Sequence, residues 1–318
     1  MDTRAESYQQ GFHRRWGQLR RPRVRALAWL LDAPDLLDAA DPQWAGRIAS
    51  TGPASPELSA WLGALDHDPA ALDEALGPRV YTRLGLYAEK LMAFYYQQHG
   101  RLVAHGLQVR ANRNDTVGEF DFLLEHGPDA LEHIELATKF YLLDGEGRSP
   151  QDWQLSALVG PNLADSLGLK MRKVFERQLE LGAHPAAQAL LPRPVARARA
   201  LVKGWLFYPA GSWPAMRGIA AGHCRGFWCA LAEVGQLAGD AFVVLPKLQW
   251  LAPFRSTSAA VMNRAQLHAE LSAQFETNST PVLVAVVREG PGYVEEVERG
   301  FIVPDDWRER AAARRMVT

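Results

Sequence analysis

The middle of the chain has the pattern of an α/β protein. Between residues 79 and 210, segments follow in the order helix, strand, strand, strand, helix, strand. Apolar residues recur at helical spacing in the first segment, whereas the next three are short runs separated by polar breaks. Residues 1–78 look helical and are punctuated by prolines, and residues 211–318 mix strands with a helix. We therefore predict an α/β core at 79–210, a helical N-terminal extension, and an α+β C-terminal extension packed on the core.

The first helix of the core is predicted between Val80 and Gln98. Apolar residues recur there every three or four positions, and the pattern stops before Gly100. Glu89 lies among these residues. Because a buried carboxylate needs a partner, we expect Glu89 either at the exposed edge of the apolar stripe or directed towards a cation.

Three strands are predicted next, at 102–110, 118–124 and 133–140. Side chains alternate between the two faces of a strand. In the second strand this places Phe120 and Phe122 on one face and Asp121 on the other.

The third strand alternates in the same way. Ile134 and Leu136 take its apolar face, and Glu135 and Lys139 take the opposite face. If the second and third strands pair, their polar faces coincide and carboxylates gather on one side of the sheet. Such a group has two explanations: solvent screening on the wet face of an antiparallel hairpin, or a bound divalent cation.

A second helix is predicted from about residue 163 to 181, with Asn162 as its N-cap. Lys170, Arg172 and Lys173 give it a basic surface beside the carboxylates, which either contacts phosphate or is an ordinary solvated face. The sixth element of the core is a strand at 197–208. In the C-terminal third, strands are predicted at 242–251, 281–288 and 293–303, and a helix at 258–275.

Composition limits the function classes. The 318 residues have a formal net charge of −1, so a nucleic-acid site would have to be a local basic patch. Six arginines between Arg14 and Arg25 offer one such patch, or a solvated surface. The two cysteines argue against a disulfide framework and suit a reducing cytoplasm. No apolar run approaches membrane-spanning length, so we expect a cytoplasmic protein without a membrane partner.

The motifs and the order of elements resemble the PD-(D/E)XK nuclease superfamily, whose restriction-endonuclease-like core runs αβββαβ. The shared motif is Gly118-Glu119-x-Asp121, followed by a strand with Glu135 and a lysine. Four longer runs resemble an uncharacterised bacterial family of unknown function assigned to that superfamily. These are Gly118-Glu-Phe-Asp-Phe-Leu, His133-Ile-Glu-Leu-Ala-Thr-Lys-Phe-Tyr-Leu, Gly204-Trp-Leu-Phe-Tyr and Trp250-Leu-Ala-Pro.

The resemblance implies a divalent-metal site. It makes Asp121 and Glu135 ligands of Mg²⁺ or Mn²⁺, with the backbone carbonyl of Leu136 as a third ligand. Glu89 matches the acidic residue that many members carry on the first helix, as a ligand and catalytic residue. The implied activity is cleavage of phosphodiester bonds in nucleic acid, with DNA favoured over RNA, and the oligomeric state stays open.

The chain departs from the superfamily pattern at its lysine. The pattern has lysine two residues after the glutamate, where this chain has Ala137, and the next lysine is Lys139. Four residues of strand span about 13 Å, against about 7 Å for two. We therefore expect either Lys139 or Lys170 to be the catalytic lysine. The alternative function is a catalytically inactive nuclease-fold protein that binds nucleic acid or another protein.

Overall fold

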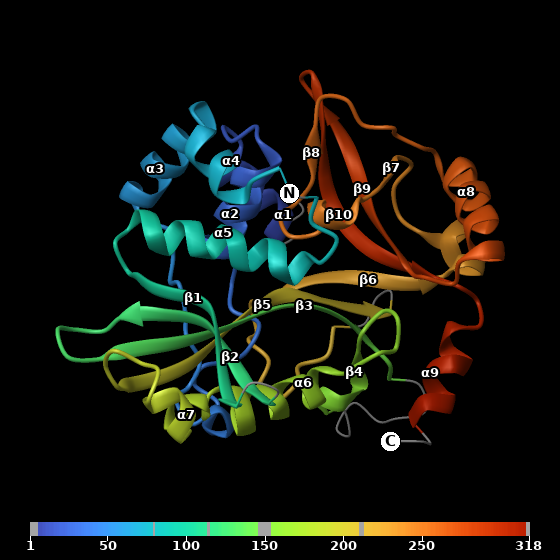
Figure 1. The fold of residues 1–318 in the computed structure, drawn as a ribbon. Helices are drawn as coiled ribbons and strands as arrows, with labels where there is room; N and C mark the ends of the chain where they lie inside the picture. Colours follow the sequence, from blue (N-terminus) through green and yellow to red (C-terminus); the bar gives the residue numbers. More distant parts are fainter. Residues whose placement is uncertain (1–5, 79, 113–114, 146–153, 210–212, 316–318) are drawn as a thin grey trace.

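The computed structural model describes residues 6–78, 80–112, 115–145, 154–209 and 213–315. Their main feature is one mixed sheet of ten strands, with helices against it (Figure 1). The strand order is β1-β2-β3-β5-β6-β10-β9-β7, with β4 paired to β3 and β8 paired to β10. The strands are β1 (Leu102–Asn112), β2 (Asp115–Glu125), β3 (Leu131–Leu143), β4 (Leu158–Val159), β5 (Val195–Pro209), β6 (Cys224–Ala230), β7 (Phe242–Val244), β8 (Arg255–Ser256), β9 (Val282–Gly290) and β10 (Tyr293–Val303).

The helices fall into three groups along the chain. The N-terminal group is α1 (Tyr8–Trp16), α2 (Pro22–Asp32), η1 (Pro42–Trp44), α3 (Pro56–His67) and α4 (Ala70–Leu76). The central group is α5 (Leu84–Gln98), η3 (Leu155–Ala157), α6 (Leu167–Lys173), η4 (Val174–Gln178), η5 (Leu181–Ala183) and α7 (Pro185–Gln188). The C-terminal group is η6 (Leu231–Gln236), η7 (Lys247–Gln249), α8 (Arg264–Thr277) and α9 (Trp307–Arg315).

The predicted order of the central elements is present. Helix α5 precedes the antiparallel strands β1, β2 and β3, and α6 precedes β5, which pairs parallel to β3. Helix α5 lies over one face of these strands, and α6 lies on the other (Figure 1). Both faces of β3 are therefore covered, and most of its residues are buried. The chain is thus an α/β protein with a large mixed sheet.

Three predicted elements differ in extent. The helix predicted at 163–181 is α6 followed by the π-helical turn η4, and Ser166 caps it in place of Asn162, because its side chain accepts the N–H of Leu169. The strand predicted at 242–251 ends at Val244, where Pro246 cannot donate to a ladder and begins the turn η7. The helix predicted from 258 begins later, behind the capping box of Asn263 and Gln266.

The N-terminal segment is joined directly to the sheet. The N–H of Leu36 donates to the carbonyl of Val202 at 3.0 Å, and Ala49 donates to Ala200 at 2.8 Å. Lys203 of β5 adds a buried ionic contact with the same segment. Its ammonium lies 2.8 Å from Asp35 and donates to the carbonyl of Ala33 and the hydroxyl of Thr51.

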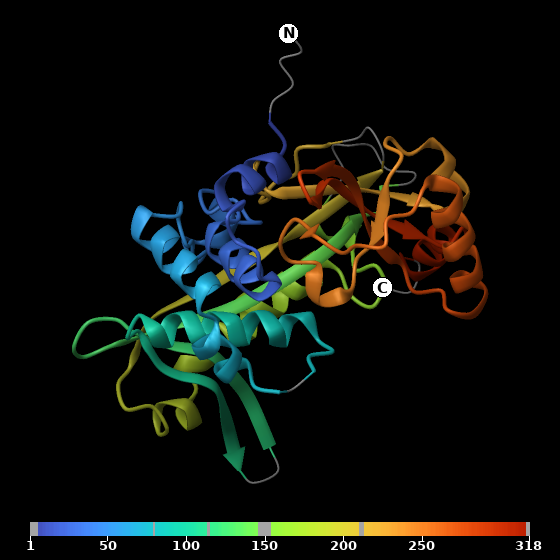
Figure 2. The same cartoon turned by 90° about the horizontal axis from the view of Figure 1, so that it is seen from above.

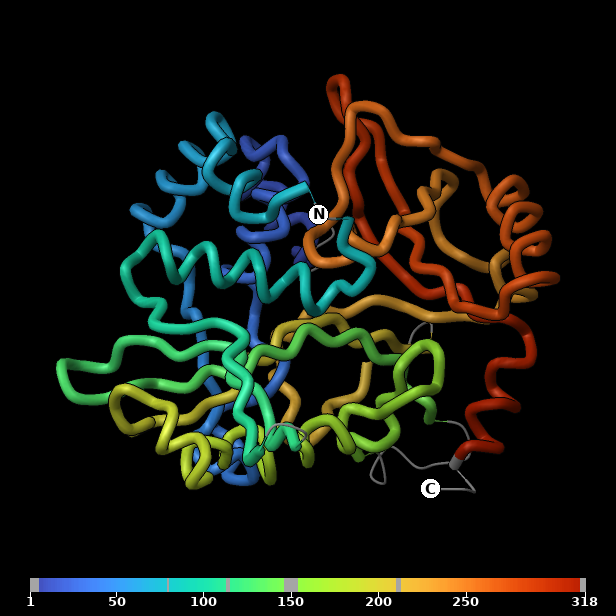
Figure 3. The backbone as a smooth tube through the Cα atoms, viewed as in Figure 1, coloured from blue at the N-terminus to red at the C-terminus, as the bar shows by residue number. Residues whose placement is uncertain are grey.

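The C-terminal third extends the same sheet beyond residue 210. Strand β6, which the sequence pattern did not predict, pairs parallel to both β5 and β10. Its Cys224 and Cys229 are buried free thiols. Helix α9 then returns towards the segment before α6, where Trp307 donates to the carbonyl of Pro161 at 2.7 Å (Figure 3). No helix within the described ranges is both long and apolar enough to cross a bilayer.

Lys203 provides a test of this arrangement. We expect Lys203→Ala to lower the free energy of unfolding by about 3 kcal/mol, because it leaves the carboxylate of Asp35 without its buried partner. Urea denaturation followed by tryptophan fluorescence measures the change. Lys247→Ala is the control, since Lys247 is exposed on η7, and it should change the free energy by less than about 0.5 kcal/mol. Equal stability of the two variants would contradict a structural role for the Lys203 contact.

Candidate active site

The candidate site lies where strands β2 and β3 separate. Their ladder runs from Glu125↔Leu131 to Phe122↔Ile134. Strand β2 continues from there in pairing with β1, whereas β3 continues in pairing with β5. The β1–β2 hairpin therefore diverges from the rest of the sheet (Figure 2).

Asp121 takes the place of a backbone partner at this separation. The N–H of Leu136 donates to Oδ2 of Asp121 at 2.9 Å. The N–H and C=O of one strand residue point to the same side in an antiparallel pair. The carbonyl of Leu136 therefore also faces the gap between the strands.

The alternation predicted for β2 breaks at Asp121. Phe122 packs against Tyr96 of α5, whereas Phe120 packs on the opposite side against His133. The prediction that these two phenylalanines share a face is therefore wrong. The cause is local irregularity: the facing strand has Gly106, with φ of 64°, between the partners of Phe120 and Phe122. Asp121 consequently reaches across the gap to β3.

Glu135 is buried beside Asp121, with 1% of its surface exposed. Its Oε1 accepts a hydrogen bond from the side-chain amide of Gln178 and lies 3.8 Å from the ammonium of Lys170. Lys170 in turn donates to Gln178 at 3.0 Å. Helix α6 and the turn η4 thus cover the carboxylate, which excludes a solvated hairpin face at this position.

Lys139 lies on the same face of β3 but has a different partner. Its ammonium is 4.0 Å from Oδ2 of Asp165, which also accepts from the hydroxyl of Tyr141 at 2.9 Å. Burial lowers the pKa of Lys139, and the neighbouring charge of Lys170 lowers it further. Of the two candidate lysines, Lys170 is therefore the one in contact with a site carboxylate.

Burial raises the pKa of all three carboxyl groups, and the charge of Asp121 raises the pKa of the other two. Burial raises the pKa of Glu135 to about 9, and the charge of Asp121 adds to this rise. Burial also raises the pKa of Asp121 to about 6, although the N–H of Leu136 opposes it. On α5, burial followed by the charge of Asp121 raises the pKa of Glu89 to about 7. The ionisation of Glu89 is thus linked to the charge of Asp121.

Two buried groups at the site have unused hydrogen-bonding capacity. Oε2 of Glu135 has no hydrogen-bond partner among the described residues, and neither does either ring nitrogen of His133. Nε2 of His133 lies 3.8 Å from that oxygen. Burial lowers the pKa of His133 to about 4, so the ring is neutral at pH 7 and forms no ion pair. Oε2 is therefore a buried acceptor without a donor.

These donors fit a hard divalent cation better than zinc. In the described part of the chain, no three His, Cys, Asp or Glu side chains are grouped as metal ligands. Mg²⁺, however, is commonly held by one or two carboxylates and completes its coordination with water. Asp121, Glu135 and the carbonyl of Leu136 supply oxygen donors of this kind, and the unpartnered Oε2 of Glu135 is a free donor atom.

Sequence reasoning did not single out Gln178, Asp165 or His133. Gln178 is placed by the π-helical turn η4, which no spacing rule predicts. His133 precedes Glu135 by two positions, so strand periodicity places it on the same face, and this signal could have identified it. Asp165 lies in the loop before α6, where sequence patterns give little guidance.

A family comparison matches most of the chain. The model described as Domain of unknown function (DUF1853) covers residues 25–303. The chain belongs to this family. Comparison with curated proteins gives no match, and neither does comparison with solved structures. The DUF1853 match includes all the residues of the candidate site, but it does not link them to the PD-(D/E)XK superfamily.

The raised pKa of Glu135 predicts how stability depends on pH. The folded state keeps a proton between pH 4.5 and about 9 that the unfolded state loses. This contribution is therefore complete below pH 4.5 and is lost as pH rises through the folded pKa. We expect the free energy of unfolding in EDTA to fall by about 1 kcal/mol or more between pH 5 and 9. Urea titrations across this range measure it.

Glu135→Gln should make that profile flatter, because the amide cannot ionise. Glu276→Gln is the matched control, since Glu276 is exposed on α8, and it should keep the wild-type profile. An unchanged slope in Glu135→Gln would mean that another group is responsible for the pH dependence.

Proposed function

We propose that the protein is a Mg²⁺- or Mn²⁺-dependent nuclease that hydrolyses phosphodiester bonds of DNA or RNA. The observation that carries the proposal is the group of buried Glu135 and half-buried Asp121 and Lys170 at the separation of β2 and β3. The motif resemblance to the PD-(D/E)XK superfamily and the helix-strand order of the central elements support it. The restriction-endonuclease-like core is part of the proposal.

The carboxylates would hold the cation. Burial opposes ionisation of both Asp121 and Glu135, and the negative charge of Asp121 repels a second charge on Glu135. A divalent cation would offset that repulsion, and Oε2 of Glu135 is an acceptor available to it. When bound, the cation would neutralise charge on the phosphate and make a water nucleophilic near neutral pH.

Glu89 and Lys170 have separate roles in the proposed reaction. The pKa of Glu89, raised to about 7, suits a group that accepts a proton from the attacking water at neutral pH. Lys170 supplies a positive charge next to the reacting phosphate, and Gln178 holds its ammonium in place. Lys139 contributes to the local field from its position beside Asp165.

The basic surface of α6 would receive the substrate. Arg172 and Lys173 are exposed on the helix that carries Lys170. Lys173 is close enough to Glu135 to lower its pKa, so its charge acts on the site. A nucleic-acid backbone lying along this surface would bring one phosphate to the carboxylates.

Cleavage assays with the site variants test the activity. We expect wild-type protein to nick supercoiled DNA, or to cut single-stranded DNA or RNA, in Mg²⁺ or Mn²⁺ but not in EDTA. Asp121→Asn and Lys170→Met should each lower the rate by about 100-fold, because each removes charge at the reacting phosphate. Lys139→Met is the matched control for Lys170→Met and should lower the rate less. Gel electrophoresis with a metal-titration series measures these rates.

Calorimetric titration with Mg²⁺ separates the two functions. Lys170→Met should keep its Mg²⁺ affinity, because lysine is not a ligand, whereas Asp121→Asn should lose it. Absence of cleavage on all three substrates, with nucleic-acid binding retained, would refute the nuclease. The alternative function of a catalytically inactive binding protein would then replace it.

Salt dependence tests the role of α6 in binding. If Arg172 and Lys173 contact two phosphates, affinity for a short DNA duplex should fall by about tenfold between 50 and 200 mM salt. The double variant R172Q/K173Q should weaken binding at low salt and reduce this slope. Fluorescence anisotropy of a labelled duplex measures both, and Lys247→Gln is the control. An unchanged slope in the double variant would place the phosphate contacts elsewhere.

A further inference from the structure

A groove lies on the other side of the molecule from the carboxylates, between the N-terminal helices and the C-terminal strands. Its largest cavity has a volume of about 710 Å³ and is lined by Arg20, Arg25, Arg255 and Tyr293. A smaller cavity continues from it along Arg25, Arg255 and Phe254. No carboxylate lines either cavity, whereas guanidinium groups line both. These two cavities are therefore locally basic in a chain whose net charge is −1, whereas two cavities that share lining residues with them include Asp66, Glu6 and Glu295.

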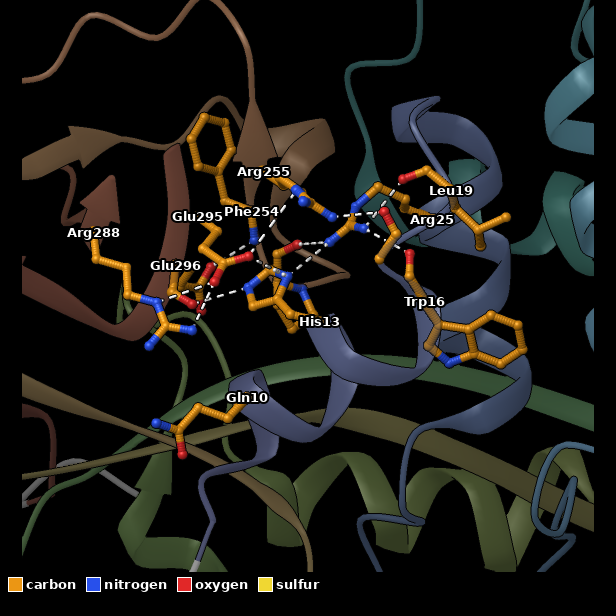
Figure 4. Close-up of polar contacts among 12 residues, drawn as sticks. Gln10, His13, Trp16, Leu19, Arg25, Phe254, Arg255, Arg288, Glu295 and Glu296 are labelled. Carbon is orange, nitrogen blue, oxygen red and sulfur yellow. Dashed lines mark hydrogen bonds and ion pairs between the residues drawn. The ribbon is translucent and has the colours of Figure 1, made fainter. Parts of the chain in front are cut away.

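Two ion pairs stand beside the groove. Arg288 donates twice to Glu295, at 2.7 and 3.0 Å, and Arg299 donates twice to Glu296, at 2.6 and 2.7 Å. Each carboxylate thus has a guanidinium of its own. Figure 4 shows Arg25, Arg255 and the pair of Arg288 and Glu295 around His13.

His13 lies among these arginines and glutamates, but its imidazole ring is neutral. Its Nδ1 lies 3.3 Å from a guanidinium nitrogen of Arg25, and its Nε2 lies 2.9 Å from the carbonyl of Glu296 (Figure 4). A guanidinium can only donate and a carbonyl can only accept, so Nδ1 accepts and Nε2 carries the single proton. Burial and the charge of Arg25 lower the pKa of His13 in agreement with a neutral ring.

Arg25 is a buried cation without a carboxylate of its own. Only 3% of its surface is exposed, and its guanidinium donates to the carbonyls of Trp16, Leu19 and Pro253. Burial lowers its pKa to about 10, and the charge of Arg255 lowers it further. These carbonyls fix the side chain but carry no net charge; Glu296, Glu295 and Asp66 act on its charge only from a distance, without an ion pair to Arg25 among the described residues.

Arg20 and Arg255 can reach a ligand. The side chain of Arg20 is exposed, and its guanidinium makes no hydrogen bond or ion pair within the described residues, while its backbone N–H donates to the carboxylate of Asp66 at 3.0 Å. Arg255 donates to the carbonyl of Gly17 at 2.6 Å and stacks over the ring of Tyr293 at 3.5 Å, while its nearest carboxylate, Glu295, is 4.0 Å away. The stacking holds the guanidinium fork at the wall of the cavity. The hydroxyls of Ser256 and Thr257 line the same cavity.

We propose that this groove binds a phosphomonoester of nucleotide size, with its phosphate between Arg20 and Arg255 above the buried Arg25. A phosphate ester carries between one and two negative charges at pH 7. This charge matches the two guanidinium groups without an ion pair among the described residues, those of Arg20 and Arg25. Its oxygens suit both guanidinium forks and hydroxyl donors. The cavity volume lies within the range of small-ligand pockets and leaves room for a base and sugar. The site is independent of the proposed nuclease site.

Binding of defined probes tests the groove. Calorimetric titration of the full chain with AMP, adenosine and inorganic phosphate should show that AMP and phosphate bind and that adenosine does not. Arg20→Gln should weaken AMP binding by about tenfold or more, the loss expected for one charge-assisted hydrogen bond. Arg255→Lys should have an effect of the same size, because lysine keeps the charge but loses the planar fork. Arg110→Gln, at an exposed arginine on β1, should bind AMP as the wild type does.

Several outcomes would overturn the proposal. One is the absence of binding by every phosphate probe, and another is equal AMP affinity in the wild type and Arg20→Gln. Arg20 is exposed, so the Arg20→Gln result does not depend on whether Arg255→Lys folds. Tighter binding of the dicarboxylate glutarate would exclude phosphate as the recognised group. Displacement of AMP by a much tighter single-stranded oligonucleotide would exclude a small ligand. Asp121→Asn should bind AMP normally. A failure of the AMP-binding proposal can therefore be distinguished from a failure of the nuclease proposal.

Discussion

The hydrogen bond from the Leu136 N–H to the Asp121 carboxylate is the contact on which the candidate site depends. A strand that leaves its neighbour exposes backbone groups, and each such group costs free energy if it is buried without a partner. Here a side chain supplies the missing acceptor, so β2 can follow β1 away from β3 without a loss of hydrogen bonding. The gap that results is where Glu135 meets helix α6. The same carboxylate thus satisfies the backbone and forms one side of the site.

Local patterns predicted the central elements well because short-range spacing determines them. The helix with Glu89 and the strands with Asp121 and Glu135 were all placed correctly, and strand parity put Glu135 and Lys139 on one face. The alternation of side chains wrongly placed Phe120 and Phe122 on one face. An irregularity beside Gly106 lets Asp121 turn into the gap between β2 and β3. The sequence also did not indicate which carboxylate each lysine contacts. Lys170 contacts Glu135 because a π-helical turn brings Gln178 beside both, and this depends on tertiary packing.

The two basic surfaces of the molecule differ in how their charge is balanced. At the sheet, burial and the charge of Asp121 oppose ionisation of Glu135 despite the nearby Lys170, so added positive charge would favour its ionised form. At the groove, three arginines and no carboxylate line the cavity, so added negative charge would be favourable there. A net charge of −1 for the whole chain hides both local imbalances. Composition could therefore exclude a global basic field but could not locate either surface, since the groove joins segments more than 200 residues apart, as in the contact between Arg25 and Pro253.

The position of β10 has a consequence for biosynthesis. Although β10 follows the other nine strands of the described sheet in the sequence, it lies between β6 and β9 in the interior of the sheet. Until the ribosome releases this segment, β6 and β9 each keep an unpaired edge, and unpaired edges are templates for association with other chains. Helix α1 precedes all these strands in the sequence, yet its packing is completed only when β10 is present, because Nε2 of His13 bonds to the carbonyl of Glu296. The nascent chain must therefore keep an incomplete sheet from associating with other chains until β10 has been synthesised.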